Sequence, residues 1–105
     1  MTMDLRVEVI GESASRTIHL NGTCDLATAP ELREALAVIN PPDVIDVLLD
    51  VSDVDFMDST GLGIVLGLLR RLREGGGSLK IAGAHGAVRR LLELTELDKV
   101  IPIVP

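Results

Sequence analysis

The residues with the clearest chemical potential are Asp58-Ser59-Thr60-Gly61, near the middle of the chain. A serine hydroxyl can accept a phosphate group, which adds nearly two negative charges at neutral pH. The same residue types are also preferred at helix N-termini, where their side chains accept hydrogen bonds from backbone N–H groups. Ser59 therefore has two interpretations, a helix cap and a site of regulatory phosphorylation, and the spacing alone leaves both open.

A second group of reactive side chains consists of His19, Cys24 and Asp25. Nucleophilic catalysis requires the nucleophile and its base to meet. His19 alternates with Ile18 and Leu20, so we expect it on the opposite face of its strand from these two. A single cysteine also excludes an internal disulfide and a cysteine-based metal cluster. We therefore expect no enzyme activity from this group.

A third group is acidic and consists of Asp50, Asp53, Asp55 and Asp58. Closely spaced carboxylates are typical of calcium loops and of phosphoaspartate enzymes. A calcium loop of the EF-hand type would need an acidic or amide residue where Met57 stands and glycine where Asp58 stands. Phosphoaspartate chemistry normally needs a longer chain with a lysine and further acids. We therefore expect a solvated acidic loop, with no metal and no cofactor.

The composition limits the fold and the partners. A chain of 105 residues is large enough for one hydrophobic core, which predicts a single domain over residues 1–105. Hydrophobic residues make up 47% of the chain and aromatic residues 1%, so the core must consist of aliphatic side chains. The formal net charge of −6 disfavours nucleic acid and anionic membranes as partners. Without a leader-like or membrane-spanning segment, the sequence predicts a cytoplasmic location.

The hydrophobic pattern predicts the elements that position these groups. An opening hairpin, with its turn at residues 11–13 and its second strand ending at Asn21-Gly22, is followed by alternating helices and strands. This order predicts an α/β fold, a mixed sheet with helices mainly on one face. The expected elements are strands over 5–9 and 18–20, a helix over 28–39, a strand over 44–51 followed by the acidic loop, a helix over 59–74, a strand over 79–81, a helix over 88–95 and an edge strand over 100–104.

The first expected helix has a clear start signal. Thr28 is suited to cap it, Glu31 three positions later can complete a capping box, and Pro30 fits the first turn. Asn40-Pro41-Pro42 is expected to stop it.

The second expected helix carries Gly63 and Gly67 on one stripe beside its apolar side. Each glycine inside a helix costs about 1 kcal/mol relative to alanine, so the pair needs a reason. Close approach of another backbone is such a reason, from a neighbouring helix of the same domain or from a partner protein. Ile64 and Leu68 flank the stripe without being clearly buried, which favours a partner.

Three blocks of the sequence, residues 22–32, 49–63 and 89–97, resemble in order the motifs of STAS domains, and in particular those of bacterial anti-sigma factor antagonists. The resemblance implies a non-enzymatic protein that binds an anti-sigma factor, itself a serine kinase of the histidine-kinase-like ATPase fold. This binding frees a sigma factor for transcription. The kinase would phosphorylate Ser59, with Thr60 as a candidate minor acceptor, and a serine phosphatase would reverse the modification.

We therefore predict that Ser59 is both helix cap and switch, on a protein that is monomeric when free. The family often has glutamate and an apolar residue where Thr23 and Cys24 stand, and many relatives continue into a final helix beyond Pro105. The alternative is a STAS scaffold in a stress-signalling complex or an accessory module of a lipid transporter. The predicted partner-binding residues are Thr23, Cys24, Asp25, Asp58, Ser59, Thr60, Gly61, Gly63, Ile64 and Gly67.

Overall fold

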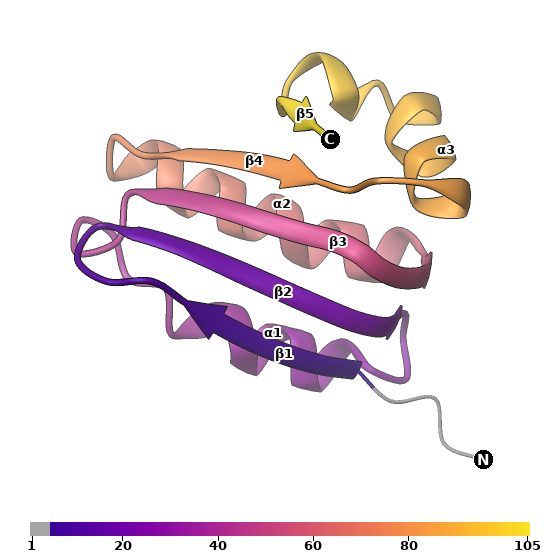
Figure 1. Ribbon diagram of the computed structural model, residues 1–105, viewed down its shortest axis with the longest axis horizontal. Coiled ribbons are helices and arrows are strands. Elements are labelled where there is room, and N and C mark those ends of the chain that lie inside the picture. Colours follow the sequence, from indigo (N-terminus) through magenta and orange to yellow (C-terminus); the bar gives the residue numbers. More distant parts are fainter. Residues whose placement is uncertain (1–4) are drawn as a thin grey trace.

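A five-stranded sheet organises the computed structural model, which describes residues 5–105. β1 (Leu5–Ile10) pairs antiparallel with β2 (Ser15–Cys24) through the expected hairpin. β3 (Asp46–Met57), β4 (Ser78–Ala82) and β5 (Ile103–Val104) then follow in order, each parallel to the strand before it (Figure 1). The predicted mixed sheet with an opening hairpin is confirmed.

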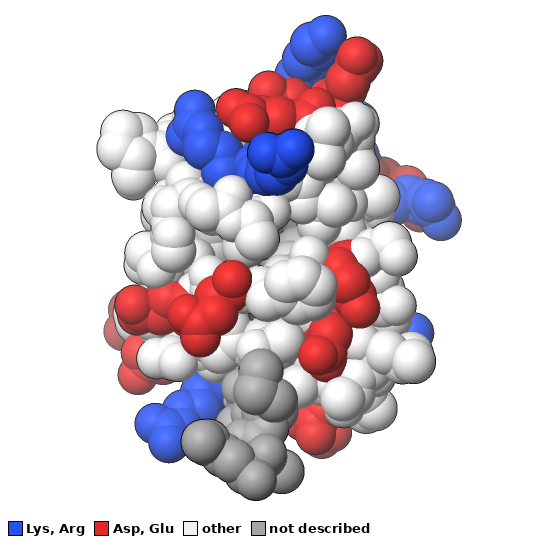
Figure 2. Space-filling model, turned by 90° about the vertical axis from the view of Figure 1, so that its right-hand side faces the viewer, with Lys and Arg blue, Asp and Glu red and all other residues white. Residues whose placement is uncertain are grey.

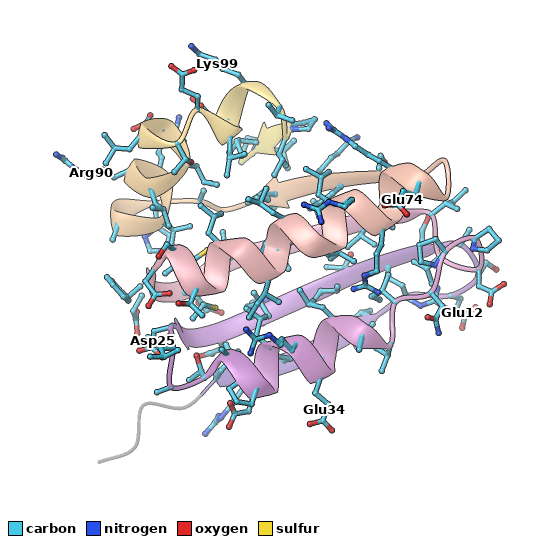
Figure 3. The ribbon with its side chains drawn as sticks, turned by 180° about the vertical axis from the view of Figure 1, so that it is seen from behind. Glu12, Asp25, Glu34, Glu74, Arg90 and Lys99 are labelled. Carbon is cyan, nitrogen blue, oxygen red and sulfur yellow. The ribbon has the colours of Figure 1, made fainter. Side chains whose placement is uncertain are left out.

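Two helices, α1 (Ala29–Ala37) and α2 (Ser59–Glu74), lie side by side on one face of this sheet (Figures 1 and 3). α3 (Gly86–Leu94) follows β4 and contacts β3, and a short 3-10 helix, η1 (Leu97–Lys99), leads to β5. Each parallel connection from β2 to β4 thus contains one helix, as the short loops of an α/β unit require.

The core lies between the sheet and the pair α1 and α2. It is aliphatic, as the composition requires, because each strand turns every second side chain towards the helices. α1 contributes two fully buried leucines that face the leucines of α2, while the central strand β3 contributes valine and leucine. Its largest fully buried side chains are Ile18, Leu20, Leu32, Leu36, Ile39, Leu49, Leu68, Leu72, Leu92 and Ile101.

β2 and β3 extend further than the sequence predicted. β2 continues past Asn21-Gly22 to Cys24, because Gly22, with φ of 122°, lies at an irregularity where the pairing with β3 shifts. β3 includes the residues predicted as an acidic loop and ends at Met57. Val54 and Met57 are buried along this extension, so pairing with β2 and burial outweigh the loop-like composition.

The helices agree with prediction at α2 and differ at α1. α2 has the predicted bounds, and Gly75 caps its C-terminus. α1 ends at Ala37, before the predicted stop, although Ile39 is still buried. Leu68 was expected near the surface but has no exposed area, because it faces α1 and the sheet.

The final predicted strand is also shorter than expected. Only Ile103–Val104 pairs with β4, because η1 takes up the preceding residues. Pro102 lies next to this edge strand, where a residue without an N–H is tolerated.

Candidate functional site

The predicted site lies at the end of the sheet where β2 and β3 finish. Cys24 and Met57, their last residues, are paired in register, so the segments that lead into α1 and α2 lie side by side. The Asp58 N–H donates to the Cys24 carbonyl at 3.1 Å, which ties the start of α2 to the end of β2. The sequence predicted this juxtaposition only indirectly, through the parallel order of the strands.

Asp58, not Ser59, caps α2. One Asp58 carboxylate oxygen accepts the Thr60 N–H at 2.9 Å and the Gly61 N–H at 3.0 Å. Ser59 is the first helical residue and is exposed, and within residues 5–105 its hydroxyl has no hydrogen-bond partner. The prediction that Ser59 is a cap is therefore wrong, since the aspartate before it already satisfies the free N–H groups. The Ser59 hydroxyl is left free for another role.

Gly61 permits close packing inside the domain. A Cβ atom at this position would lie 2.7 Å from the Cys24 carbonyl oxygen and 3.0 Å from the Cys24 Cβ. Only glycine therefore lets the first turn of α2 approach the end of β2 so closely. This contact explains Gly61 without a partner protein.

The loop from Cys24 to Thr28 is held by its own polar groups. The Asp25 carboxylate accepts the Ala27 N–H at 2.9 Å and the Thr28 N–H at 3.1 Å. The Thr28 hydroxyl donates to the Thr23 carbonyl at 2.7 Å and accepts the Asp25 N–H at 3.0 Å. Thr28 occupies the N-cap position of α1, but its side chain bonds back to this loop and not to the helix, so the predicted capping box does not form.

Two of the predicted partner-binding side chains are inside the protein. Thr23 is 3% exposed and Cys24 is 0% exposed, so their side chains support the site from beneath. Burial raises the pKa of the Cys24 thiol to about 11, and the nearby charges of Asp25 and Asp58 act in the same direction. The thiol is therefore protonated at neutral pH and a poor nucleophile.

His19 lies on the opposite face of the sheet from α1 and α2, as predicted, and does not meet Cys24. Its Nδ1 lies 3.0 Å from an Asp50 carboxylate oxygen, and its Nε2 lies 2.9 Å from an Asp53 carboxylate oxygen. The hydrogen bond with Asp50, supported by that with Asp53, raises the pKa of His19 above its ordinary value. The nucleophile, base and acid considered from the sequence are thus not assembled.

The acidic residues have structural partners. Asp50 and Asp53 hold His19, and Asp58 caps α2. Burial would raise the pKa of Asp50, but hydrogen bonds from Ser52 and His19 outweigh it and lower that pKa below its ordinary value. Among residues 5–105, no three His, Cys, Asp or Glu side chains are placed to hold a metal ion.

A surface groove of about 670 Å³ runs between α1 and α2, and Ser59 and Thr60 lie among its lining residues. Its lining includes the predicted Gly63, Ile64 and Gly67. Within residues 5–105, nothing lies within 4 Å of a Cβ added at Gly63 or Gly67, so a close internal contact does not explain these glycines. Ile64 is half-buried in the wall.

Three further groove residues were missed from the sequence, namely Arg33, Leu36 and Arg70. Leu36 follows Arg33 by three positions, a spacing that places both on one side of α1. Helical spacing could therefore have indicated a shared face, but not that this face lies opposite α2.

The end of the molecule that carries Ser59 has a distinct distribution of charge. Figure 2 views this end and shows acidic side chains in separate groups with uncharged surface between them. Asp25, Asp55 and Asp58 belong to the segments that meet here. Within residues 5–105, no helix is both long and apolar enough to cross a membrane.

The parallel β2 and β3, the capped start of α2 and the helix pair on one sheet face define a small α/β domain of the STAS type. The family model of the STAS domain matches residues 6–105. An anti-sigma-B factor antagonist of Staphylococcus aureus (strain NCTC 8325 / PS 47) is 31% identical over 101 residues, covering 96% of this chain and 94% of the relative. The chain therefore belongs to the STAS-domain family.

Solved structures agree with this assignment. An anti-sigma factor antagonist from Mycobacterium paratuberculosis matches 97% of this chain and 86% of its own, with a TM-score of 0.86 and 27% identity. The anti-sigma factor antagonist SpoIIAA in its unphosphorylated form covers 97% of this chain and 89% of its own, with a TM-score of 0.80 and 21% identity. The Bacillus SpoIIAA structure in the phosphorylated form covers 97% and 92%, with a TM-score of 0.74 and 20% identity. At these identities, the two SpoIIAA structures show a shared fold.

Proposed function

We propose that this protein is an anti-sigma factor antagonist that binds a serine-kinase anti-sigma factor in the cytoplasm and is switched off by phosphorylation of Ser59. The observation that carries the proposal is the exposed Ser59 hydroxyl, which has no partner within residues 5–105 and lies at the α1–α2 groove. The similarity to curated anti-sigma-B factor antagonists supports the general role. In this role the domain acts by binding and catalyses no reaction.

The unphosphorylated surface is suited to close contact. Ser59, Thr60, Gly63 and Gly67 lie along the groove, and the two glycines leave its wall without side chains. A partner backbone can therefore approach α2 at these positions, which offsets the helix stability that glycine costs. Thr23, Cys24 and Gly61 hold the end of β2 against α2 beneath this surface.

Phosphorylation would change this surface without changing the fold. A phosphate at the first residue of α2 lies near the positive end of the helix dipole, where an anion is tolerated. It adds about −1.5 to −2 charges beside Asp58, which already carries negative charge. A partner fitted to a neutral hydroxyl loses contact and meets repulsion. SpoIIAA, known in both phosphorylation states, shares the fold, which is consistent with a phosphate being carried by an intact domain.

The test is intact-mass spectrometry after incubation with ATP and serine-kinase anti-sigma factors from the same genome. We expect one added phosphate on the wild type and on Thr60→Ala, and none on Ser59→Ala. A phosphatase from that genome should remove it. If none of the kinases modifies the wild type, the proposal fails and the protein is to be pursued as a scaffold or transporter module.

A binding measurement separates charge from shape at Ser59. Ser59→Asp adds a charge, whereas Ser59→Asn has nearly the same size and none. We expect Ser59→Asp to weaken binding of the anti-sigma factor about tenfold or more relative to Ser59→Asn, because a like charge at an interface is costly. Equal affinities would contradict the electrostatic part of the proposal.

A further inference from the structure

Two large apolar side chains are exposed beside Ser59 without an internal reason. Leu26 is 75% exposed and Phe56 is 46% exposed. They lie close to each other along the chain ends that meet here, since Phe56 is paired with Thr23, three residues before Leu26. Phe56 is also the single aromatic residue of the sequence. Isolated exposed apolar residues are common, so the argument depends on what surrounds these two.

The position of Leu26 is fixed by the loop that carries it. Asp25 and Thr28 cross-link the loop through the hydrogen bonds described above, so the backbone on either side of Leu26 is held. The leucine therefore projects outward from a built turn. Side chains that are already positioned lose less entropy when they become buried against a partner, which is the usual property of an interface anchor.

The position of Phe56 is fixed by the sheet. Met57, the next residue, is buried, so the alternation along β3 turns Phe56 outward. Two residues later in the chain, Asp58 begins the turn that presents Ser59. The aromatic ring thus lies one strand residue and one cap away from the proposed phosphorylation site.

The surroundings indicate the chemistry of the partner. Asp25, Asp55 and Asp58 lie in the same segments as the two apolar residues, and Figure 2 shows acidic groups around uncharged surface at this end. Apolar side chains inside a charged rim form the usual plan of a binding surface. A complementary partner has apolar pockets bordered by Lys or Arg.

We infer that Leu26 and Phe56 are the two apolar anchors of the anti-sigma factor interface, inserting into pockets that basic residues of the anti-sigma factor surround. The inference rests on the proposed function, because it takes the serine-kinase anti-sigma factor as the occupant. The acidic rim, solvated and outside the anchors, attracts this partner. A phosphate on Ser59 lies inside the contact, where its desolvation is costly, so it weakens binding even though the partner is basic.

The test is calorimetric titration of the full-length chain with the serine-kinase anti-sigma factors of the same genome. Leu26→Ser and Phe56→Ser should each weaken binding about tenfold or more, as expected for anchor residues. Val38→Ser is the matched control, since Val38 is 62% exposed just beyond the far end of α1, and it should bind like the wild type. Asp55→Asn should reduce the loss of affinity on adding salt.

The outcomes separate this inference from the proposed function. If an anti-sigma factor binds the wild type and both anchor variants equally, the inference is overturned while the proposed function stands. If none binds the wild type, both are overturned. Sedimentation of the free chain covers a second copy as the occupant: a wild-type dimer that Leu26→Ser and Phe56→Ser abolish would also overturn the inference.

Discussion

The Asp58 carboxylate accepts hydrogen bonds from two N–H groups of α2, whereas the Ser59 hydroxyl is exposed and has no partner within residues 5–105. Asp58→Ala should therefore lower the free energy of unfolding by about 1 kcal/mol, the usual effect of losing an N-cap. Ser59→Ala should change it by only a few tenths of a kcal/mol. Urea denaturation at neutral pH measures both. A Ser59→Ala effect as large as that of Asp58→Ala would return the capping role to Ser59.

His19 gives a second prediction at the same scale, a dependence of stability on pH. Its pKa is raised above 6.5 in the folded protein, so its contribution is complete below pH 6.5 and is lost as pH rises through the higher folded value. The pKa of Asp50 is lowered below 3.8, so its contribution is complete above pH 3.8 and is lost as pH falls through the lower folded value. The pair stabilises the protein most between these two limits.

His19→Gln tests this window. The difference in unfolding free energy between wild type and His19→Gln should be larger at about pH 5.5 than at about pH 8.5, because the charged ring is lost at high pH. Urea denaturation at the two pH values measures it. Asp50→Asn serves as the control, since it removes the first partner and should reduce the same difference. A difference that is constant with pH would show that the ring contributes by packing alone.

At the scale of the element, three glycines in one helix have different tasks. Gly61 packs against the Cys24 carbonyl, whereas Gly63 and Gly67 face the open groove. Gly61→Ala should destabilise the protein by about 1–3 kcal/mol through overpacking. Gly63→Ala and Gly67→Ala should stabilise it by about 0.5–1 kcal/mol each, because alanine favours a helix and its Cβ meets nothing within 4 Å.

Thermal denaturation of the three variants measures this order. In the proposed function, the larger Gly63→Leu and Gly67→Leu should also block binding of the anti-sigma factor while the domain stays folded. Destabilisation by Gly63→Ala or Gly67→Ala would mean that the groove is closed in solution.

Elements were predictable where local signals decide their ends. α2 has its predicted bounds because Asp58 stops the strand and caps the helix, and because Gly75 and Gly76 end it. β2 and β3 were predicted too short, since Gly22 and the acidic residues resemble loop formers in isolation. Their pairing is a tertiary effect, with Val54 and Met57 buried along the extension.

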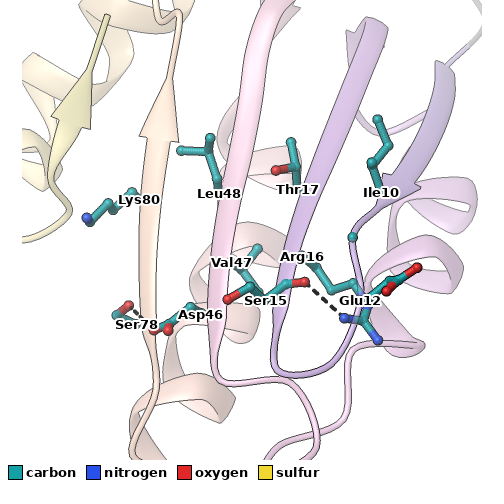
Figure 4. A pocket seen from close by; sticks show the side chains of 11 residues that line it. Ile10, Glu12, Ser15, Arg16, Thr17, Asp46, Val47, Leu48, Ser78 and Lys80 are labelled. Carbon is teal, nitrogen blue, oxygen red and sulfur yellow. Dashed lines mark hydrogen bonds between the residues drawn. The ribbon is translucent and has the colours of Figure 1, made fainter.

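At the scale of the molecule, two surfaces of the sheet differ. α1 and α2 cover one face, and the other face is bare of helices over the stretch drawn in Figure 4. There Ile10, Thr17, Leu48 and Lys80 lie in one row across four strands, with a depression of about 550 Å³. This depression lies at the hairpin end, away from Ser59, so the proposed partner surface and the bare sheet face are separate regions.

The candidate site was predictable in its centre and not in its outline. The spacing of Asp58, Ser59 and Thr60 pointed to the first turn of a helix, and the three sequence blocks pointed to the family. The groove needs α1 opposite α2, which periodicity cannot show, so Arg33 and Arg70 were missed. Burial of Thr23 and Cys24 follows from the extension of β2 and was equally hidden from the pattern.

The last prediction concerns the domain as a whole, which has a radius of gyration of 12.6 Å. A chain of 100 residues folded compactly has about 13 Å, so there is little room for further compaction. The free protein should sediment as a monomer of 11.2 kDa, because its net charge of −6 opposes self-association and its edge strand β5 is only two residues long. Phosphorylation of Ser59 should leave both quantities unchanged, since the phosphate sits at a helix N-terminus that is already folded and capped.

Small-angle scattering and sedimentation of the two phosphorylation states measure this, with Ser59→Ala treated with the same kinase as the control. If the phosphorylated chain expands or dimerises while the control does not, the switch works by rearranging the domain. If size and mass stay constant while binding is lost, the switch acts at the surface of α2, and the fold is a rigid support that presents one hydroxyl.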